Sequence, residues 1–308
     1  MNPRISVVIP TYNRCSLLVK AIDSILSGSL KIDAYEIIVS DDGSTDETEI
    51  IILKYLEKYS NIIYLKNKHS GSPAKVRNYG IKKAQGEIIA FIDDDGIADR
   101  YWLEMGLKEF ENSSIAGIEG EINSDIRFTI KNSFFPVKGK RYTTINGKGW
   151  YGYYLLNMFY RKSILEKVNY LDESFIHGSC EDIDLAWRVL DFGEIKYCSD
   201  IKVFHPVKRF TSKSEKIRYC SEINTHQALL CKKHPETFKI FFEHTLSYNV
   251  FHVGYYSYFI GLIKGGIRDH SISALYKIII PALIYILKDS IKKIMRIKNK
   301  ILRILWKK

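Results

Sequence analysis

The sequence predicts an α/β fold in which a doubly wound, mostly parallel β-sheet carries helices on both faces. The first half of the chain alternates short apolar segments with longer segments whose apolar residues recur at helical spacing. Short strands that are continuously apolar are typical of parallel sheets, which are buried on both sides. The chain has 308 residues, 46% of them hydrophobic, and can bury a substantial core in one large domain or two.

The expected elements follow one another in a regular order. Strands are predicted at 5–10, 35–40, 61–65 and 87–92, and helices at 17–26, from 44 to about 59, and at 72–84. Ser44 and Glu47 have the spacing of a capping box, and Pro73 stands near the start of the third helix. Further along we expect strands and a long loop over 113–160, a helix over 181–193 closed by Gly193, and short strands at 195–198 and 201–204.

Polar and acidic residues follow the ends of three predicted strands, at 10–13, 41–43 and 93–95. Ligands of doubly wound sheets bind beyond the carboxyl ends of the strands, so these residues are expected to converge on one rim. Three adjacent carboxylates repel one another. A divalent ion such as Mg²⁺ or Mn²⁺, shared with the phosphates of a nucleotide diphosphate, would offset their charge. Taken alone, three consecutive acids favour a solvated turn slightly over a metal site.

Five motifs stand in order along the chain: IPTYNR at 9–14, SDDGSTDET at 40–48, AKVRNYGI at 74–81, FIDDDG at 91–96 and EDIDLAWR at 181–188. Over roughly residues 4–210 the sequence resembles the inverting glycosyltransferases of family two, which have a GT-A fold and use nucleotide-diphosphate sugars. The resemblance implies a catalytic domain over 1–212, with a nucleotide-sugar-binding half at 1–112 and an acceptor-side half at 113–212. Residues 213–308 would form a separate, C-terminal helical region.

The resemblance implies that residues from four motifs hold the nucleotide: Pro10, Thr11, Tyr12, Asn13, Asp42, Arg77, Asp93 and Asp94. Tyr12 would stack on the base. Asp42 would accept a hydrogen bond from it, which favours UDP over GDP or dTDP as the carrier. Asp41 is a candidate for the turn that holds Asp42 in place. Arg77 would contact the nucleotide and brace the acidic rim.

The resemblance also implies a site for Mn²⁺ or Mg²⁺. Asp93 and Asp95 match the DxD motif of the family, with Asp95 as the direct ligand and Asp93 nearer the ribose or a metal-bound water. Asp94 could take one of these roles instead. His205, in KVFHP, would complete the metal shell or contact the diphosphate; the alternative is a structural histidine before a turn-forming proline.

Asp182 matches the general base of the family, which takes the proton of the attacking hydroxyl in a single displacement that inverts the anomeric carbon. Gly178, Glu181 and Trp150 are expected on the acceptor side, with Gly178 allowing a close approach. The alternative for Glu181 and Asp182 is that they only cap a helix. Trp187 is expected in the core. The chain lacks a QxxRW element, so we expect a hexosyltransferase that adds one sugar per encounter.

The formal charge of +11 lies mostly in the tail. Residues 288–308 hold nine Lys and Arg against one acid, which leaves a nearly neutral body and no basic groove for nucleic acid. The five cysteines form no CxxC pair and indicate reduced thiols in the cytosol. No N-terminal secretory signal is recognisable, which also favours the cytosol.

The C-terminal third is apolar before it becomes basic. Residues 245–263 contain no charged side chain, but their Tyr, Ser, Asn and His content is high for a membrane span. The tail interleaves apolar residues with cations and favours an anionic lipid surface. We therefore expect a peripheral protein on the inner face of the cell membrane with a glycan or lipid-linked acceptor. The alternatives are packing on the catalytic domain or a homo-oligomer through these helices.

Two other functions remain open at this point. One is a catalytically inactive, membrane-attached protein that binds a nucleotide sugar or serves as a scaffold. The other is a nucleotidyltransferase, which also joins a doubly wound sheet to metal-binding acids. That class requires a Gly-rich, basic loop after the first strand, and PTYNR does not provide one.

Overall fold

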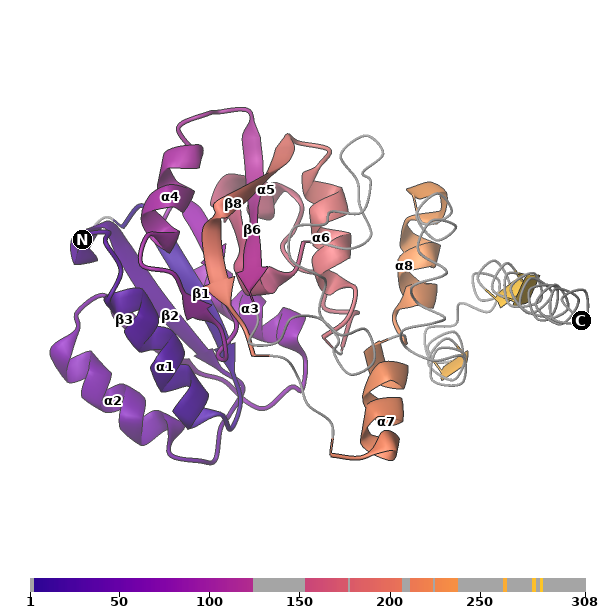
Figure 1. Ribbon diagram of the computed structural model, residues 1–308, viewed down its shortest axis with the longest axis horizontal. Helices are drawn as coiled ribbons and strands as arrows, with labels where there is room; N and C mark the ends of the chain where they lie inside the picture. The colour runs from indigo at the N-terminus through magenta and orange to yellow at the C-terminus, as the bar shows by residue number, and fades with distance from the viewer. Residues whose placement is uncertain are drawn as a thin grey trace, which may run out of the picture. The chain divides into compact units, whose positions relative to one another are not determined.

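The computed structural model describes residues 3–123, 153–176, 178–206, 211–223 and 225–237, with the short segments 263–264, 279–280 and 283–284 (Figure 1). The chain separates into two compact units, residues 1–209 and 210–308. Trp150 and the basic tail lie outside the described residues. Within the described part of the chain, no helix is both long enough and apolar enough to cross a membrane.

The first unit is built on an eight-stranded sheet with the strand order β3-β2-β1-β4-β7-β6-β8-β5. The four strands of the first half are parallel to one another: β1 (Ile5–Thr11), β2 (Tyr35–Asp41), β3 (Ile62–Lys66) and β4 (Ile88–Phe91). The others are β5 (Ile97–Ala98), β6 (Ile115–Asn123), β7 (Met158–Arg161) and β8 (Glu194–Phe204). β7 is antiparallel to β4 and β6, β5 is antiparallel to β8, and β6 is parallel to β8. The sheet is therefore mixed, with the predicted parallel order in its first half.

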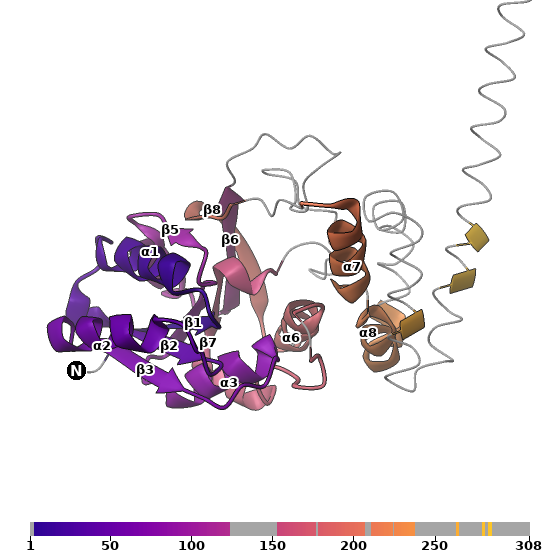
Figure 2. The ribbon, with the colours of Figure 1, turned by 90° about the horizontal axis from the view of Figure 1, so that it is seen from below.

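Helices cover both faces of this sheet. α1 and α2 lie on one face and α3 on the other, as right-handed crossovers from β1 to β2, β2 to β3 and β3 to β4 require (Figure 2). The helices of the first unit are α1 (Cys15–Leu26), α2 (Thr48–Lys58), α3 (Pro73–Lys83), α4 (Trp102–Glu109), α5 (Lys162–Lys167) and α6 (Glu181–Val189). Short 3₁₀ turns occupy Ile32–Ala34 and Leu155–Asn157, and the second unit contains α7 (Lys213–Ile223) and α8 (Gln227–Lys233).

Strand β1 divides its side chains between two cores. Ile5, Val7 and Ile9 are fully buried and pack in one cluster with α1 and α4. Val8 points to the opposite face, because successive side chains of a strand alternate. There it meets α3 at Gly80, where an added Cβ would lie 2.6 Å from Val8 Cγ1. A strand buried on both faces accounts for the mostly apolar segment at 5–9, whose one polar residue, Ser6, is buried and donates to Glu36.

Replacing Gly80 by alanine is expected to lower the free energy of unfolding by about 1–3 kcal/mol through overpacking. Val8 is fully buried and β-branched, so a change of its χ1 rotamer to relieve the contact is unfavourable. Urea denaturation measures the change. In a Val8→Ala background the same substitution should cost little, because alanine favours the helix once the space is free. An equal loss of unfolding free energy in both backgrounds would show that the contact with Val8 is not the cause of the destabilisation.

The predicted capping box at the start of α2 is wrong. Ser44 is used in the preceding turn, where its Oγ donates to Asp41 Oδ1 at 2.6 Å and accepts from the Asn13 N–H at 2.8 Å. The helix begins only at Thr48, whose N–H donates to Asp46 Oδ1 at 3.1 Å. The third predicted helix is confirmed: Ser72 caps α3 through Oγ, which accepts from the Lys75 N–H.

Four other elements, α4, α5, α6 and β8, differ from prediction. α6 ends at Val189 and not at Gly193, because the Phe192 N–H turns back to the Val189 carbonyl at 2.9 Å. The two predicted strands near the end of the domain form the single strand β8, whose pairing with β6 shifts register after Cys198. Helices α4 and α5 were not predicted. Cys15, Cys180, Cys198 and Cys231 form no disulfide in the described part of the chain.

Candidate functional site: the carboxyl end of the sheet

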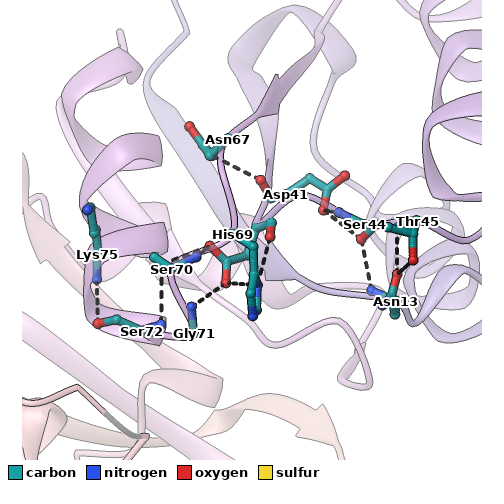
Figure 3. Close-up of polar contacts among 11 residues, drawn as sticks. Asn13, Asp41, Ser44, Thr45, Asn67, His69, Ser70, Gly71, Ser72 and Lys75 are labelled. Atoms are coloured by element: carbon teal, nitrogen blue, oxygen red, sulfur yellow. Dashed lines mark hydrogen bonds and ion pairs between the residues drawn. The ribbon is translucent and has the colours of Figure 1, made fainter.

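The loops that follow β1 and β2 are connected to each other by hydrogen bonds. Asn13 has a left-handed backbone with φ of 52°, which asparagine tolerates, and its Oδ1 accepts from the Thr45 N–H at 2.7 Å (Figure 3). Asp41 is fully buried and holds the turn as predicted, because its Oδ1 accepts from the Ser44 N–H at 2.8 Å. Tyr64 donates to the other oxygen of Asp41 at 2.6 Å. The Asn13 amide oxygen is therefore used in holding the two loops together.

Asp42 is bound by the loop between β3 and α3. Its Oδ1 accepts from the Ser70 N–H and Oγ, both at 2.8 Å, and its Oδ2 accepts from the Gly71 N–H at 2.8 Å (Figure 3). Gly43 brings the two loops together: its φ is 80°, and a Cβ there would lie 2.9 Å from the Asn67 carbonyl oxygen. A side chain at position 43 would separate the loops, so glycine is required.

Two aromatic rings lie next to Asp42. Tyr12, 40% exposed, stacks on His69 with ring centroids 4.2 Å apart and planes inclined by 20°. His69 Nδ1 lies 2.9 Å from Asp42 Oδ2. The predicted base-binding residues Tyr12 and Asp42 are thus neighbours, and His69, which sequence reasoning missed, touches both.

The three acids after β4 pair with two arginines: Asp94 and Asp95 share Arg14, and Asp93 contacts Arg77. Asp94 is 3% exposed and turns inward, where Thr11 Oγ1 donates to it at 2.9 Å and Arg14 Nη1 at 2.7 Å. Asp95 pairs with the other nitrogen of Arg14, and its Oδ1 lies 3.1 Å from His205 Nε2. Asp93 Oδ1 accepts from Arg77 Nη2 at 2.7 Å. These acids lie in a turn, in which the Gly96 N–H donates to the Asp93 carbonyl at 2.9 Å, so Arg14 can bridge Asp94 and Asp95 while Asp93 turns to Arg77.

The environments of Asp94 and Asp95 set their pKa values apart. Burial raises the pKa of Asp94 to about 7, although Arg14 and Thr11 act in the opposite direction. Burial also raises that of Asp95, but the hydrogen bond and charge of His205, together with Arg14, bring the pKa of Asp95 down to about 2. Asp95 is therefore an anion at every physiological pH.

Asp95 and His205 fit a divalent ion that is shared with a diphosphate. Mg²⁺ and Mn²⁺ take one or two carboxylates and keep water or phosphate oxygens in the remaining positions. The contact between Asp95 and His205 places both side chains within reach of one ion. Among the described residues, no three His, Cys, Asp or Glu side chains form a complete cage. Arg14, which sequence reasoning also missed, is the counter-charge of Asp94 and Asp95 in this structure.

Arg77 connects the acidic rim with the first turn of α6. Its side chain is 8% exposed and pairs with Asp93 at 2.7 Å and with Glu181 Oε1 at 3.4 Å. Among the described residues, Arg77 Nε and Glu181 Oε2 are buried without a hydrogen-bond partner. Asp182 follows Glu181 directly and is only partly buried. The guanidinium of Arg77 thus connects the residues after the end of β4 with the start of α6, about ninety residues further along the chain.

The first two carboxyl groups of α6, Glu181 and Asp182, have raised pKa values. Burial and the adjacent carboxylate of Glu181 raise the pKa of Asp182 well above its usual range. Burial raises the pKa of Glu181 as well, against the charge of Arg77. Perturbed acids of this kind are typical of sites that move protons. Trp187, on the same helix, is 1% exposed and belongs to the core, as predicted.

The segment that leads into α6 contains Gly178 and Cys180. A Cβ on Gly178 would lie 3.5 Å from Pro73 Cγ and 3.8 Å from Glu181 Oε1, which are ordinary contacts. The close approach predicted for Gly178 concerns the acceptor and stays a prediction. The residue with the unusual backbone is Cys180, at φ 69°, a conformation that glycine adopts more easily. Trp150, the other residue predicted on this side, lies outside the described residues.

Comparison with known proteins supports the family. The profile of glycosyl transferase family 2 matches residues 6–168, more than half of the chain. The glycosyltransferase AglE of Haloferax volcanii is 27% identical over 219 residues, 68% of each chain. A poly(ribitol-phosphate) beta-glucosyltransferase of Bacillus spizizenii is 41% identical over 93 residues, 30% of this chain. The chain spans only 15% of that enzyme, and 12% of the Bacillus subtilis protein GgaB.

Two solved structures share the fold. TarS residues 1–349 of S. aureus, in complex with UDP, has a TM-score of 0.56 and 20% identity over 79% of this chain and 72% of that one. The mannosyltransferase PcManGT of Pyrobaculum calidifontis, with GDP-Man and Mn²⁺, has a TM-score of 0.58 and 15% identity over 96% and 81%. With the matched profile and the clustered motif residues, these similarities show that the chain belongs to glycosyl transferase family 2 and is a glycosyltransferase of the GT-A type.

Proposed function

We propose that this glycosyltransferase is metal-dependent and inverting, and that it moves one sugar from a nucleotide-diphosphate sugar to a hydroxyl of a glycan or lipid-linked acceptor. The observation that carries the proposal is the Arg77 bridge. It joins Asp93, on the rim where a diphosphate would lie, to Glu181, the neighbour of Asp182. Single displacement requires the donor and the proton acceptor to be held in a fixed geometry, and Arg77 links the proposed diphosphate rim to the residue next to Asp182.

In the proposed reaction the acceptor oxygen attacks the anomeric carbon while the nucleotide diphosphate leaves from the opposite face. Asp182 accepts the hydroxyl proton as the new bond forms, and its raised pKa makes it a stronger base than an ordinary aspartate. A divalent ion at Asp95 and His205 would supply charge neutralisation for the departing diphosphate. Arg77 and Arg14 hold the acids of the rim in place.

UDP is the carrier we propose. The stacked ring of Tyr12 beside the Asp42 carboxylate offers a flat surface and an acceptor for a ring N–H, which uracil has. TarS is a structural relative that has been solved with UDP and with UDP-GlcNAc. Guanine also has a ring N–H, and PcManGT has been solved with GDP-Man. A GDP-sugar is therefore the second candidate.

We also propose that the enzyme works in cell-envelope assembly at the inner face of the membrane. The support is the composition of residues 288–308, whose cations and apolar residues suit an anionic lipid surface. Two relatives are named for transfer to poly(ribitol-phosphate), TarS of S. aureus and the enzyme of B. spizizenii. An acceptor of this anionic, polyol-phosphate kind is consistent with the proposal.

Calorimetry with UDP, GDP, CDP and dTDP, each with and without Mn²⁺, tests the donor class. We expect one nucleotide to bind in a Mn²⁺-dependent manner, and Asp95→Ala to weaken that binding about 100-fold or more. Asp33→Ala, which removes an exposed carboxylate from a 3₁₀ turn, is the matched control and should bind as the unmodified protein does. A folded sample that binds none of the four nucleotides would refute the proposed function.

A further inference from the structure

The imidazole of His69 lies where the proposed function expects a nucleotide base. His69 belongs to the loop between β3 and α3, and its ring stacks on Tyr12 with centroids 4.2 Å apart. Its side chain is 51% exposed, so solvent reaches the ring. Figure 3 shows His69 among the polar contacts of its own loop. One face of the Tyr12 ring is therefore covered by a side chain of the protein itself.

The hydrogen bond from His69 to Asp42 also resembles the one proposed for a nucleotide base. Nδ1 lies 2.9 Å from Asp42 Oδ2 and 3.1 Å from the Asp42 carbonyl oxygen. Both neighbours are acceptors, so Nδ1 carries the proton and donates it. A flat ring on Tyr12 with an N–H directed at Asp42 reproduces the two contacts proposed for uracil.

Asp42 has no acceptor position left for a second ring. Each carboxylate oxygen accepts about two hydrogen bonds. Oδ1 accepts from the Ser70 N–H and Oγ, and Oδ2 accepts from the Gly71 N–H and His69 Nδ1. The two N–H groups belong to the backbone of the loop and cannot leave without unfolding it. His69 is the exposed side chain, and it can swing into solvent.

We propose that His69 occupies the base subsite of the ligand-free protein and is displaced when a nucleotide binds, so that this residue sets the nucleotide affinity. The inference rests on the proposed function, which assigns the base to Tyr12 and Asp42. The apparent dissociation constant of a ligand rises by the inverse of the fraction of protein whose site is open. A stack and a hydrogen bond to a carboxylate keep that fraction small.

Two substitutions of His69 distinguish whether its ring competes with the nucleotide base or helps to bind it. His69→Ala removes both contacts and should bind UDP, in the presence of Mn²⁺, about tenfold more tightly than the unmodified protein. His69→Phe retains a ring that can stack on Tyr12 and lacks the N–H, so its affinity should lie between the two. If His69 instead held the base, alanine would weaken UDP binding and phenylalanine would preserve it.

A second measurement follows the ring itself. In protein labelled at histidine, the His69 ring signal is assigned by its absence from the His69→Phe spectrum. Addition of UDP and Mn²⁺ should move that signal to the position of a solvent-exposed imidazole. Unchanged or weaker UDP binding by a folded His69→Ala variant would overturn the inference, and so would a His69 signal that saturating UDP leaves unmoved.

The outcome also distinguishes this inference from the function on which it rests. If the unmodified protein binds UDP or GDP with Mn²⁺ but the His69 variants do not follow the expected order, only the displacement is wrong. If neither the unmodified protein nor His69→Ala binds either nucleotide, the proposed function fails and the displacement fails with it.

Discussion

Replacing Asp182 by asparagine is expected to reduce the rate of sugar transfer by about 10²–10⁴-fold and to leave nucleotide binding nearly unchanged. Asparagine has the same shape, but it cannot accept the proton of the attacking hydroxyl. Asp182 Oδ1 accepts from the Ile183 N–H at 2.8 Å, and an amide oxygen can keep that contact. Release of UDP from UDP-sugars in the presence of glycan acceptors measures the rate, and calorimetry measures the binding.

The control for this variant is Asp200→Asn, which changes an exposed carboxylate of β8. It should transfer sugar at the unmodified rate, since Asp200 lies away from the rim. If Asp182→Asn retained more than about a tenth of the activity, Asp182 would be no more than a helix-capping residue, and the base would have to be sought elsewhere.

The pH profile of kcat/KM gives the same assignment an independent test. A general base works only when deprotonated, so activity should fall as the pH decreases through the raised pKa of Asp182. The acid limb should therefore lie at a higher pH than that of an ordinary aspartate. Glu181→Gln removes the neighbouring negative charge and should move the limb to lower pH. A limb that does not respond to Glu181→Gln would assign the titration to another group.

The first half of the sheet could be predicted because local pattern and tertiary environment agree there. Strands β1 and β2 are mostly apolar and buried on both faces, so their composition largely defines them, although Ser6 and Glu36 are buried polar residues that hydrogen-bond to each other. The start of α2 could not be predicted, because Ser44 serves two distant partners, Asp41 and Asn13, in place of the helix. α4 was missed since its eight residues give too short a periodic pattern.

The site could be predicted residue by residue but not in its contacts. The resemblance to a family assigned Asp42, Arg77 and Asp182 by their motifs. It could not show that Asp42 is saturated by donors about 28 residues away, or that Arg14 pairs with acids about 80 residues away. Such contacts depend on how loops from different strands meet. The contacts that His69 makes with Tyr12 and Asp42, and those that Arg14 makes with Asp94 and Asp95, therefore emerge only from the structure.

Replacing Arg77 by methionine is expected to lower the free energy of unfolding by about 3–5 kcal/mol, because it leaves Glu181 buried without its counter-charge. Glu181 is 5% exposed, and one of its oxygens already lacks a partner among the described residues. Asp93 loses its 2.7 Å contact in the same variant, so nucleotide binding should weaken as well. Chemical denaturation and calorimetry measure the two effects separately.

The double variant Arg77→Met/Glu181→Gln should recover part of the lost stability, because no unpaired charge then remains in the interior. Lys66→Met is the matched control: it breaks a 2.6 Å pair with Glu49 in which both side chains are more than 40% exposed, and should cost less than about 1 kcal/mol. If Arg77→Met cost no more than Lys66→Met, the bridge would carry no stability. If the double variant recovered stability but not nucleotide binding, Arg77 would serve the ligand through Asp93 and the fold through Glu181.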